Sequence, residues 1–148
     1  MSSNALSFAR QFILAPTSTG AISPASDQLA ELMVKSADVS KQQSIVELGP
    51  GTGVVTEVIA ANLSPGTHFF ALELNPVFAE KTRQRCPGVK VYNDNALNLI
   101  DQLAAAGLSQ CDCILSSLPW TLFDKNLQQK LIAVIASALK PGGALVTY

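Results

Sequence analysis

Short apolar runs alternate along the chain with longer stretches in which apolar residues recur at helical spacing. Runs rich in Val, Ile, Leu and Phe predict five strands, at about 44–48, 67–73, 89–92, 111–116 and 144–148. Helical spacing predicts one helix before the first strand, at about 24–37. It predicts four more between the strands, at about 54–62, 76–86, 95–106 and 124–139. Strands that alternate with helices are typical of an α/β fold with a parallel sheet, and right-handed crossovers make such a sheet doubly wound.

Several of these helices have recognisable ends. Asn75 followed by Pro76 is a favoured cap and first helical position, and Ser23 followed by Pro24 is a second such pair. We expect the segment Pro141-Gly142-Gly143 to end the last helix and to precede the last strand. The chain stops within that strand, so we expect a truncated form.

The composition excludes several classes of protein. At 148 residues the chain has the length of one domain. Its 48% apolar and 14% charged residues exclude intrinsic disorder, because disordered chains are rich in charge and poor in apolar residues. A net charge of −1 gives no overall attraction to nucleic acid. No apolar stretch reaches the roughly 18 residues that a membrane span needs.

The cysteine content and the first residues bear on the compartment. Three cysteines and the absence of a secretory pattern in the first 15 residues predict a cytoplasmic protein with free thiols. Cys111, Cys113 and the single histidine, His68, are a poor set for zinc, which takes four nitrogen or sulfur ligands in structural sites. We therefore expect no metal.

The strongest chemical signal is a glycine-rich turn between the first strand and the helix that follows it. The turn reads Glu47-Leu48-Gly49-Pro50-Gly51-Thr52-Gly53. Glycines allow a sharp turn and a close approach of a ligand, and open α/β sheets bind ligands beyond the carboxyl ends of their strands. The dinucleotide fingerprint fails, because its third glycine would fall at Val54 or Thr56, and no phosphate-loop lysine follows.

The remaining pattern, an acidic residue followed by three alternating glycines, resembles motif I of the class I S-adenosylmethionine (SAM) methyltransferases. Glu73, Asp94-Asn95-Ala96 and Ser116-Ser117-Leu118-Pro119-Trp120 follow the next three strands, in the family's order. The resemblance implies a Rossmann-like sheet with strand order 3-2-1-4-5 that lacks the family's C-terminal strands 6 and 7. It implies one methyltransferase domain over 1–148, in which 1–40 form a helical cover and 44–148 the cofactor-binding sheet.

The resemblance also implies a cofactor site for SAM, with S-adenosylhomocysteine (SAH) as the product. Glu47 would orient the methionine end, Glu73 would bind the ribose hydroxyls, and Leu74 would pack on the adenine. Asp94 or Asn95 would contact the adenine amino group. The choice stays open because a gapless match of Asp94-Asn95-Ala96 to the family's usual Gly-Asp-Ala puts Asn95 where the family has the acid. The full expected set is Ile22, Glu47, Gly49, Gly51, Gly53, Glu73, Leu74, Asp94, Asn95, Ala96 and Ser116.

The segment after the fourth strand resembles motif IV of amino-methylating enzymes. By that resemblance, Ser117 and the main chain at Leu118 and Pro119 would hold the acceptor amine, and Trp120 would line its pocket. Ser117 stands where these families usually have Asn. The aromatic ring could also face a cationic amine. An ordinary core position for Trp120 is the alternative.

The upstream segment together with ELGPGTGVVT and SSLPW resembles the bacterial phospholipid N-methyltransferases, which are related to the rRNA adenine dimethyltransferases. The implied acceptor is the amine of a phospholipid such as phosphatidylethanolamine, at the membrane surface. A helix expected over 2–15 would lie on the membrane or pack on the sheet edge. RNA adenine methylation and a non-catalytic SAM-binding fragment are the alternatives. We expect a homodimer through the exposed last strand.

Overall fold

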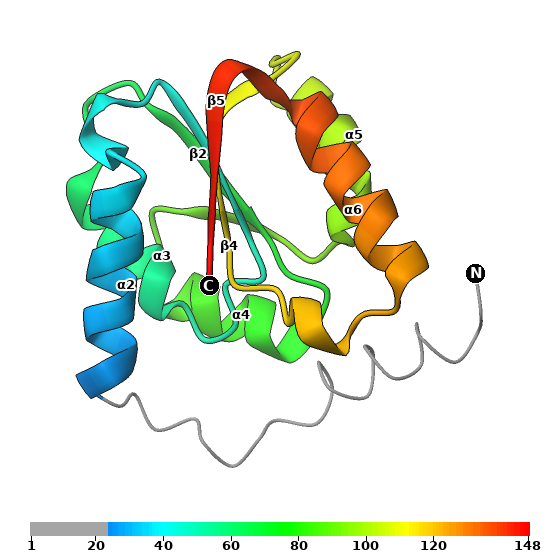
Figure 1. The fold of residues 1–148 in the computed structure, drawn as a ribbon. Coiled ribbons are helices and arrows are strands. Elements are labelled where there is room, and N and C mark those ends of the chain that lie inside the picture. Colours follow the sequence, from blue (N-terminus) through cyan, green and yellow to red (C-terminus); the bar gives the residue numbers. More distant parts are fainter. Residues whose placement is uncertain (1–23) are drawn as a thin grey trace.

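A five-stranded parallel sheet forms the centre of the computed structural model, which describes residues 24–148 (Figure 1). The strand order is β3-β2-β1-β4-β5, as the sequence predicts. The strands are β1 (Ser44–Leu48), β2 (His68–Leu72), β3 (Lys90–Tyr92), β4 (Cys111–Ser116) and β5 (Leu139–Thr147). β1 lies in the middle and pairs in parallel with β2 and β4. Its residues are all buried, as expected for a central strand covered on both faces.

Helices cover both faces of this sheet (Figure 1). One face carries α5 (Leu99–Ala105) and α6 (Lys125–Ala138), which pack on Val46, Leu48 and Ile114. The other face carries α2 (Pro24–Ser36) and α3 (Val54–Asn62), which pack on Ile45 and Leu115. α4 (Pro76–Arg85) packs beside β2 and β3. Because neighbouring residues of a strand point to opposite faces, Glu47 shares the α3 face with Ile45.

The helix starts follow local capping chemistry. The Asn75 side chain accepts hydrogen bonds from the backbone N–H groups of Val77 and Phe78, at 2.9 and 3.2 Å, and Pro76 opens α4. This pair confirms the sequence prediction. The Asp124 side chain caps α6 in the same way by accepting from the Leu127 N–H at 2.8 Å.

Two segments differ from the elements that the sequence predicts. The stretch expected as one helix over 95–106 begins with a 3-10 turn (Ala96–Asn98), because the Asn95 side chain caps the Leu97 N–H and the Asn95 carbonyl accepts from the Asn98 N–H. β5 begins at Leu139, five residues before the expected start. Leu139 pairs with Cys111 and Ala144 with Cys113, so residues 140–143 form an irregularity inside the strand and not a separate turn.

Gly143 and Gly142 make this irregularity possible. A Cβ on Gly143 would lie 2.9 Å from the carbonyl oxygens of Asp112 and Lys140, and Gly142 has a φ of +79°. Both positions therefore suit only glycine, which the sequence pattern indicates without revealing that the strand continues across them.

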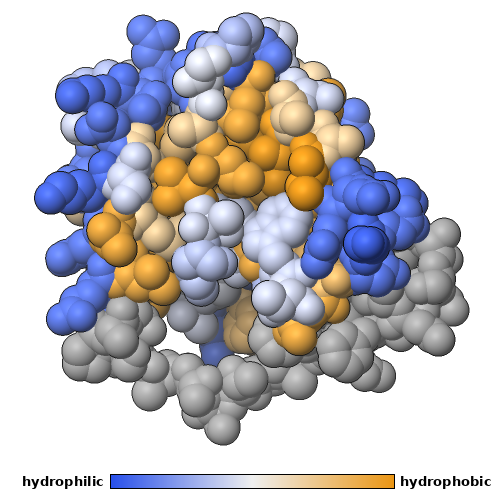
Figure 2. Space-filling model, viewed as in Figure 1, coloured by the Kyte–Doolittle hydropathy of each residue, from blue (hydrophilic) through white to orange (hydrophobic). Residues whose placement is uncertain are grey.

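β5 is the edge of the sheet and pairs only with β4 within residues 24–148. Figure 2 shows hydrophobic residues gathered on the face of the molecule where β5 runs, with hydrophilic residues toward both sides. Leu145 and Tyr148 are 37% and 67% exposed. Among the described helices, none is both long and apolar enough to cross a membrane. The helix expected over 2–15 and the cofactor residue expected at Ile22 lie outside the described residues.

Candidate functional site

Backbone hydrogen bonds join the four expected motif segments at the carboxyl edge of the sheet. The Gly49 N–H donates to the Leu72 carbonyl at 2.9 Å, which ties the glycine turn to the end of β2. The Ser117 N–H donates to the Leu48 carbonyl at 3.0 Å, which ties the segment after β4 to the end of β1. The Asp94 N–H donates to the Glu73 carbonyl at 3.1 Å. The sequence therefore placed these segments correctly at neighbouring strand ends.

The three glycines of the turn have different roles, although all have positive φ: +72° at Gly49, +61° at Gly51 and +93° at Gly53. A Cβ on Gly49 would lie 3.0 Å from the Leu118 side chain, so Gly49 lets the segment after β4 pack closely. A Cβ on Gly53 would press on Thr82 and Arg85 at 3.3 Å. A Cβ on Gly51 would meet nothing within 4 Å, so the space beside Gly51 is open to a ligand.

Glu47 is a fully buried carboxyl group beside this turn. Its Oε1 accepts a hydrogen bond from the Thr56 hydroxyl of α3 at 2.5 Å. Its Oε2 is the one buried side-chain oxygen or nitrogen without a hydrogen-bond partner in the described part of the chain. Burial raises the pKa of Glu47 to about 8, with a further rise from the charge of Glu73 and an opposing effect of the Thr56 hydroxyl. The carboxyl group is therefore largely protonated at neutral pH.

Glu73 follows β2 and fixes the glycine turn. Its Oε1 accepts from the Gly51 N–H at 2.8 Å, and its Oε2 accepts from the Asn75 N–H at 3.0 Å. Only 5% of Glu73 is exposed, and burial raises the pKa of its carboxyl group against the effect of these backbone donors. Because each carboxylate oxygen can accept more than one hydrogen bond, both oxygens keep capacity for a further donor.

Asp94 and Asn95 have different local duties. The Asp94 carboxylate accepts from the Asn95 N–H at 2.7 Å, from the Asn98 side chain at 2.8 Å and from the Gln102 side chain at 2.8 Å. The hydrogen bond from Gln102 is the largest cause of the lowered pKa of Asp94. The Asn95 side-chain oxygen accepts from the Leu97 N–H at 2.9 Å. Asp94 thus organises the start of the next helix, and Asn95 has fewer hydrogen bonds to other parts of the chain.

The segment after β4 is held by Ser116. This fully buried serine accepts hydrogen bonds from the Leu118 N–H and from the Trp120 indole N–H, both at 3.2 Å. The Trp120 ring also packs edge-on against Phe123, with 6.1 Å between ring centroids. Ser117, Leu118, Pro119 and Trp120 are all half-buried. Trp120 is therefore a half-buried residue that packs against the hydrophobic core at the end of β4.

Sequence reasoning missed the supporting residues of the site. Thr56 holds Glu47, and the hydroxyl of Thr82 on α4 donates to the Gly51 carbonyl at 2.8 Å. Both threonines are fully buried on helices. A polar residue on the buried face of a helix is a sequence signal, but its partner becomes visible only when the fold is known.

Arginines near the end of α4 have protein partners. Arg85 pairs with Glu57 at 2.8 Å, and the Arg83 guanidinium donates to the Val91 carbonyl at 2.8 and 3.0 Å. Cys86, Cys111 and Cys113 are free and buried. Within residues 24–148, no group of three or more His, Cys, Asp or Glu side chains could hold a metal ion.

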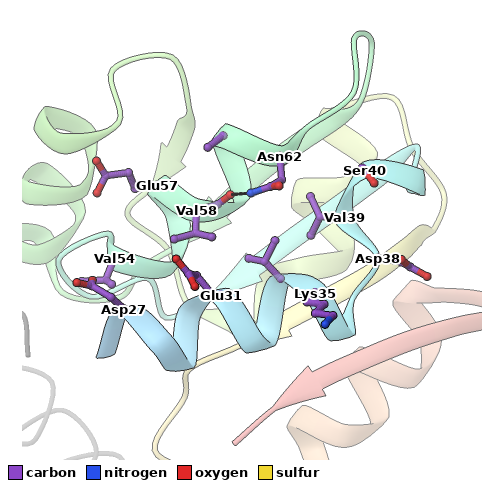
Figure 3. A pocket seen from close by; sticks show the side chains of 12 residues that line it. Asp27, Glu31, Lys35, Asp38, Val39, Ser40, Val54, Glu57, Val58 and Asn62 are labelled. Atoms are coloured by element: carbon purple, nitrogen blue, oxygen red, sulfur yellow. Dashed lines mark hydrogen bonds between the residues drawn. The ribbon is translucent and has the colours of Figure 1, made fainter. Parts of the chain in front are cut away.

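A groove with a volume of about 600 Å³ lies between α2, the 3-10 turn Val39–Lys41 and α3 (Figure 3). Acidic side chains, among them Asp27 and Glu31, line it together with Lys35 and several valines. Asn62 at its far end donates to the Val58 carbonyl at 2.8 Å. None of the expected site residues lines this groove.

Comparisons with known proteins agree with this geometry. A family model described as a methyltransferase domain matches residues 46–145, more than half of the chain. An ornithine lipid N-methyltransferase of Singulisphaera acidiphila is 32% identical over 139 residues, and the match covers 92% of this chain and 72% of the relative.

Solved structures share the fold at lower identity. The N-methyltransferase NodS of Bradyrhizobium japonicum, in complex with SAH, has a TM-score of 0.70 and 16% identity over 97% of this chain and 71% of NodS. An O-methyltransferase of Bacillus cereus, also with SAH, has a TM-score of 0.66 and 20% identity over 99% of this chain and 66% of that enzyme.

TrmN of Thermus thermophilus is a longer protein with a TM-score of 0.65 and 17% identity. The match covers 82% of this chain, which spans only 37% of TrmN. The strand order and the glycine turn described above agree with the family match and with the 32% identical relative. These findings show that this chain belongs to the class I SAM-dependent methyltransferases.

Proposed function

We propose that this chain transfers a methyl group from SAM to the primary amine of a membrane lipid headgroup, such as that of phosphatidylethanolamine. The observation that supports a lipid acceptor is the similarity to the relative named ornithine lipid N-methyltransferase. That match covers 92% of this chain. Ornithine lipids and phosphatidylethanolamine both present a primary amine on a polar headgroup. The reaction would take place at the cytoplasmic membrane surface.

The cofactor would occupy the carboxyl edge of the sheet. Two observations support the fit: the open space beside Gly51 and the buried Glu47 oxygen that lacks a partner among the described residues. Gly49, Gly51 and Gly53 would bring backbone close to the ligand. Glu47 would orient the methionine end through its open oxygen, and Glu73 would accept the ribose hydroxyls with its remaining lone pairs.

The adenine would lie between the ends of β2 and β3. Leu74, which is 38% exposed, would pack on the ring. Either Asp94 or Asn95 would accept from the adenine amino group, because Oδ2 of Asp94 and the Asn95 side-chain oxygen each accept one hydrogen bond within the chain and keep a lone pair. Ala96 would complete this wall.

The acceptor amine would enter beside the segment that follows β4. Ser117 would accept an N–H hydrogen bond, together with main-chain carbonyls at Leu118 and Pro119. Trp120 would form the pocket wall and attract a cationic amine through its ring face. Ser116 is expected from the resemblance to bind the cofactor, but its hydroxyl already accepts hydrogen bonds from Leu118 and Trp120. We therefore propose that Ser116 acts mainly on the acceptor, indirectly, by holding these two residues.

Bound SAM would supply an electrophilic methyl group: the carbon–sulfur bond would break as the nitrogen–carbon bond forms, with SAH as the leaving group. The headgroup ammonium would first release a proton to solvent water, because only the neutral amine has a lone pair for the attack. The chain's own contribution is placement. The Ser117 segment holds the amine, and the hydrogen bond between the Ser117 N–H and the Leu48 carbonyl fixes that segment against the strand that carries the glycine turn. Such alignment can lower a barrier by about 7–11 kcal/mol, so no strong base is needed.

The test supplies SAM with a labelled methyl group to the chain together with vesicles of phosphatidylethanolamine or ornithine lipid and total bacterial RNA. We expect the label in the organic phase after extraction, and its loss with the Gly51→Val variant. Label that appears only in precipitated RNA would overturn the lipid acceptor and favour the adenine acceptor. SAH binding without any transfer would indicate a chain that only binds the cofactor.

A further inference from the structure

The two carboxyl oxygens of Glu47 are in different situations. Oε1 accepts the hydrogen bond from Thr56 at 2.5 Å, and both side chains are fully buried. Oε2 is equally buried, but it has no hydrogen-bond partner in the described residues. A buried polar atom without a partner costs free energy, so its presence points to a donor that arrives with a ligand.

Thr56 determines which oxygen stays open. It is the third residue of α3, and it approaches Glu47 on the face of β1 that α2 and α3 cover. Thr in a helix is restricted to two χ1 rotamers, and the complete burial of Thr56 further limits the movement of its hydroxyl. A carboxyl group bound at Oε1 by a fixed donor cannot rotate freely between its two oxygens.

The other groups that act electrostatically on Glu47 do not supply the missing donor. Glu73 lies after β2, and Cys86 lies at the end of α4. Glu73 accepts backbone hydrogen bonds from Gly51 and Asn75, whereas the Cys86 thiol is 3.9 Å from the Gly53 carbonyl, to which it donates. No described side chain therefore donates to Oε2.

We propose that Thr56 is a positioning residue, whose hydroxyl holds Oε1 of Glu47 so that Oε2 accepts a hydrogen bond from the ammonium group of bound SAM. This inference rests on the proposed cofactor role of Glu47. The hydroxyl of Thr56 itself would not touch the cofactor. Through Glu47, it would affect the binding of only one end of the cofactor, the end that carries the ammonium group.

Two probes separate that end from the rest of the ligand. SAH keeps the ammonium group, and 5′-methylthioadenosine lacks the amino-acid end altogether. Thr56→Val preserves the side-chain shape and removes the donor. We expect calorimetry to show about tenfold weaker SAH binding by Thr56→Val, the loss expected for one hydrogen bond to a charged group. We expect binding of 5′-methylthioadenosine to change by less than about twofold.

Three further variants sharpen the test. Thr56→Ser keeps the hydroxyl and should bind SAH nearly as the unaltered chain does. In a Glu47→Gln background, Thr56→Val should cause little further loss, because both changes act on one interaction. Thr67→Val is the matched control: its hydroxyl donates to the Gln42 carbonyl at 3.1 Å, before the strands begin. It should leave both affinities unchanged.

Two results would overturn the positioning role while leaving the proposed function intact. One is that Thr56→Val weakens the binding of SAH and of 5′-methylthioadenosine equally, and the other is that it leaves SAH binding unchanged. Thermal unfolding without ligand shows whether each variant is folded. If Thr56→Val does not fold, Thr56→Ala removes the same donor and carries the same expectation. An unaltered chain that binds neither probe would overturn the proposed function as well as this inference.

Discussion

Glu47 links the stability of the fold to the chemistry of the site at the scale of one residue. The carboxyl group is fully buried, and its pKa is raised from 4.5 to about 8 mainly by that burial. At a pH between these two pKa values, the folded chain therefore keeps a proton on Glu47 that the unfolded chain has released. A cationic ligand group would favour the charged form, so the same carboxyl can be neutral in the free chain and ionised in the complex.

The pH dependence of stability tests this environment. Because the folded pKa of Glu47 is raised, its contribution is fully present below about pH 4.5 and is lost as the pH rises through about 8. We expect the free energy of unfolding to fall across that range, by at most about 1.4 kcal/mol per pH unit from this group. Urea unfolding of the unaltered chain and of Glu47→Gln at several pH values measures the effect.

Glu47→Gln should flatten this slope, because an amide of the same shape does not titrate. Glu73 also has a raised pKa, and it stays in both proteins as a common background of the same sign. Equal slopes for the two proteins would show that Glu47 is ionised in the folded chain at neutral pH.

The sequence predicts candidate site residues, whereas the residues that hold them in place are visible only in the structure. Glu47 and Gly51 stand in the glycine-rich motif after the first strand, and Glu73 follows the second strand, where the family resemblance predicts an acidic residue. Thr56 and Thr82 support the turn through contacts that depend on how helices pack on the sheet. Such contacts join residues with no fixed spacing, so a single sequence does not reveal them.

At the scale of elements, hydrogen bonds from both neighbouring elements hold the segment between β4 and α6. Ser116 holds the Leu118 N–H and the Trp120 indole, and the Gln128 side chain of α6 donates to the Trp120 carbonyl at 2.8 Å. The short 3-10 turn Trp120–Leu122 is thus anchored from β4 and from α6. This anchoring gives the expected acceptor wall a fixed position.

Ser116→Ala should remove the hydrogen bonds that hold Leu118 and Trp120, so this segment should become more mobile. We expect the KM for the lipid acceptor to rise about tenfold, the scale of one or two lost hydrogen bonds, while SAH affinity changes much less. Trp120 is the single tryptophan of the chain, so its fluorescence reports the same change directly. An unchanged emission spectrum together with an unchanged KM would contradict the anchoring role of Ser116.

Element types were predictable from the sequence, whereas some boundaries were not. The central strand Ser44–Leu48 is a short run of apolar residues with one serine and one acid, and its predicted limits are confirmed. The start of β5 was wrong by five residues, because proline and two glycines usually end an element. Here Gly142 and Gly143 adopt a backbone that lets pairing with β4 resume.

At the scale of the whole molecule, the outer edge of β5 pairs with no other strand of residues 24–148. An edge strand presents unpaired backbone groups that can pair with another strand. Leu145 and Tyr148 add exposed apolar surface at this edge, and Figure 2 shows the hydrophobic patch around it. We therefore expect two copies of the chain to associate through β5.

Light scattering over a range of concentrations measures this association. We expect the mean mass to rise toward that of a dimer, and Leu145→Lys to return it toward the monomer, because a charge at a strand edge opposes pairing. A monodisperse monomer at high concentration would contradict association through this edge. The sequence predicted the edge itself, because the strand order follows from the family resemblance and the order places the fifth strand outermost.

The central claim is that the glycine turn at the carboxyl edge of the sheet binds the cofactor, and a matched pair of glycine variants tests it most directly. Gly51 and Gly66 both have positive φ, +61° and +83°, and a Cβ would meet no neighbour within 4 Å at either position. Gly51→Val and Gly66→Val should therefore cost similar backbone strain, about 1–2 kcal/mol.

Calorimetric titration with SAH separates the two variants. We expect Gly66→Val to bind SAH as the unaltered chain does, and Gly51→Val to lose affinity by at least about a hundredfold, because the valine side chain would fill the space that the ligand needs. Unchanged SAH affinity in Gly51→Val would contradict the placement of the cofactor beside this turn.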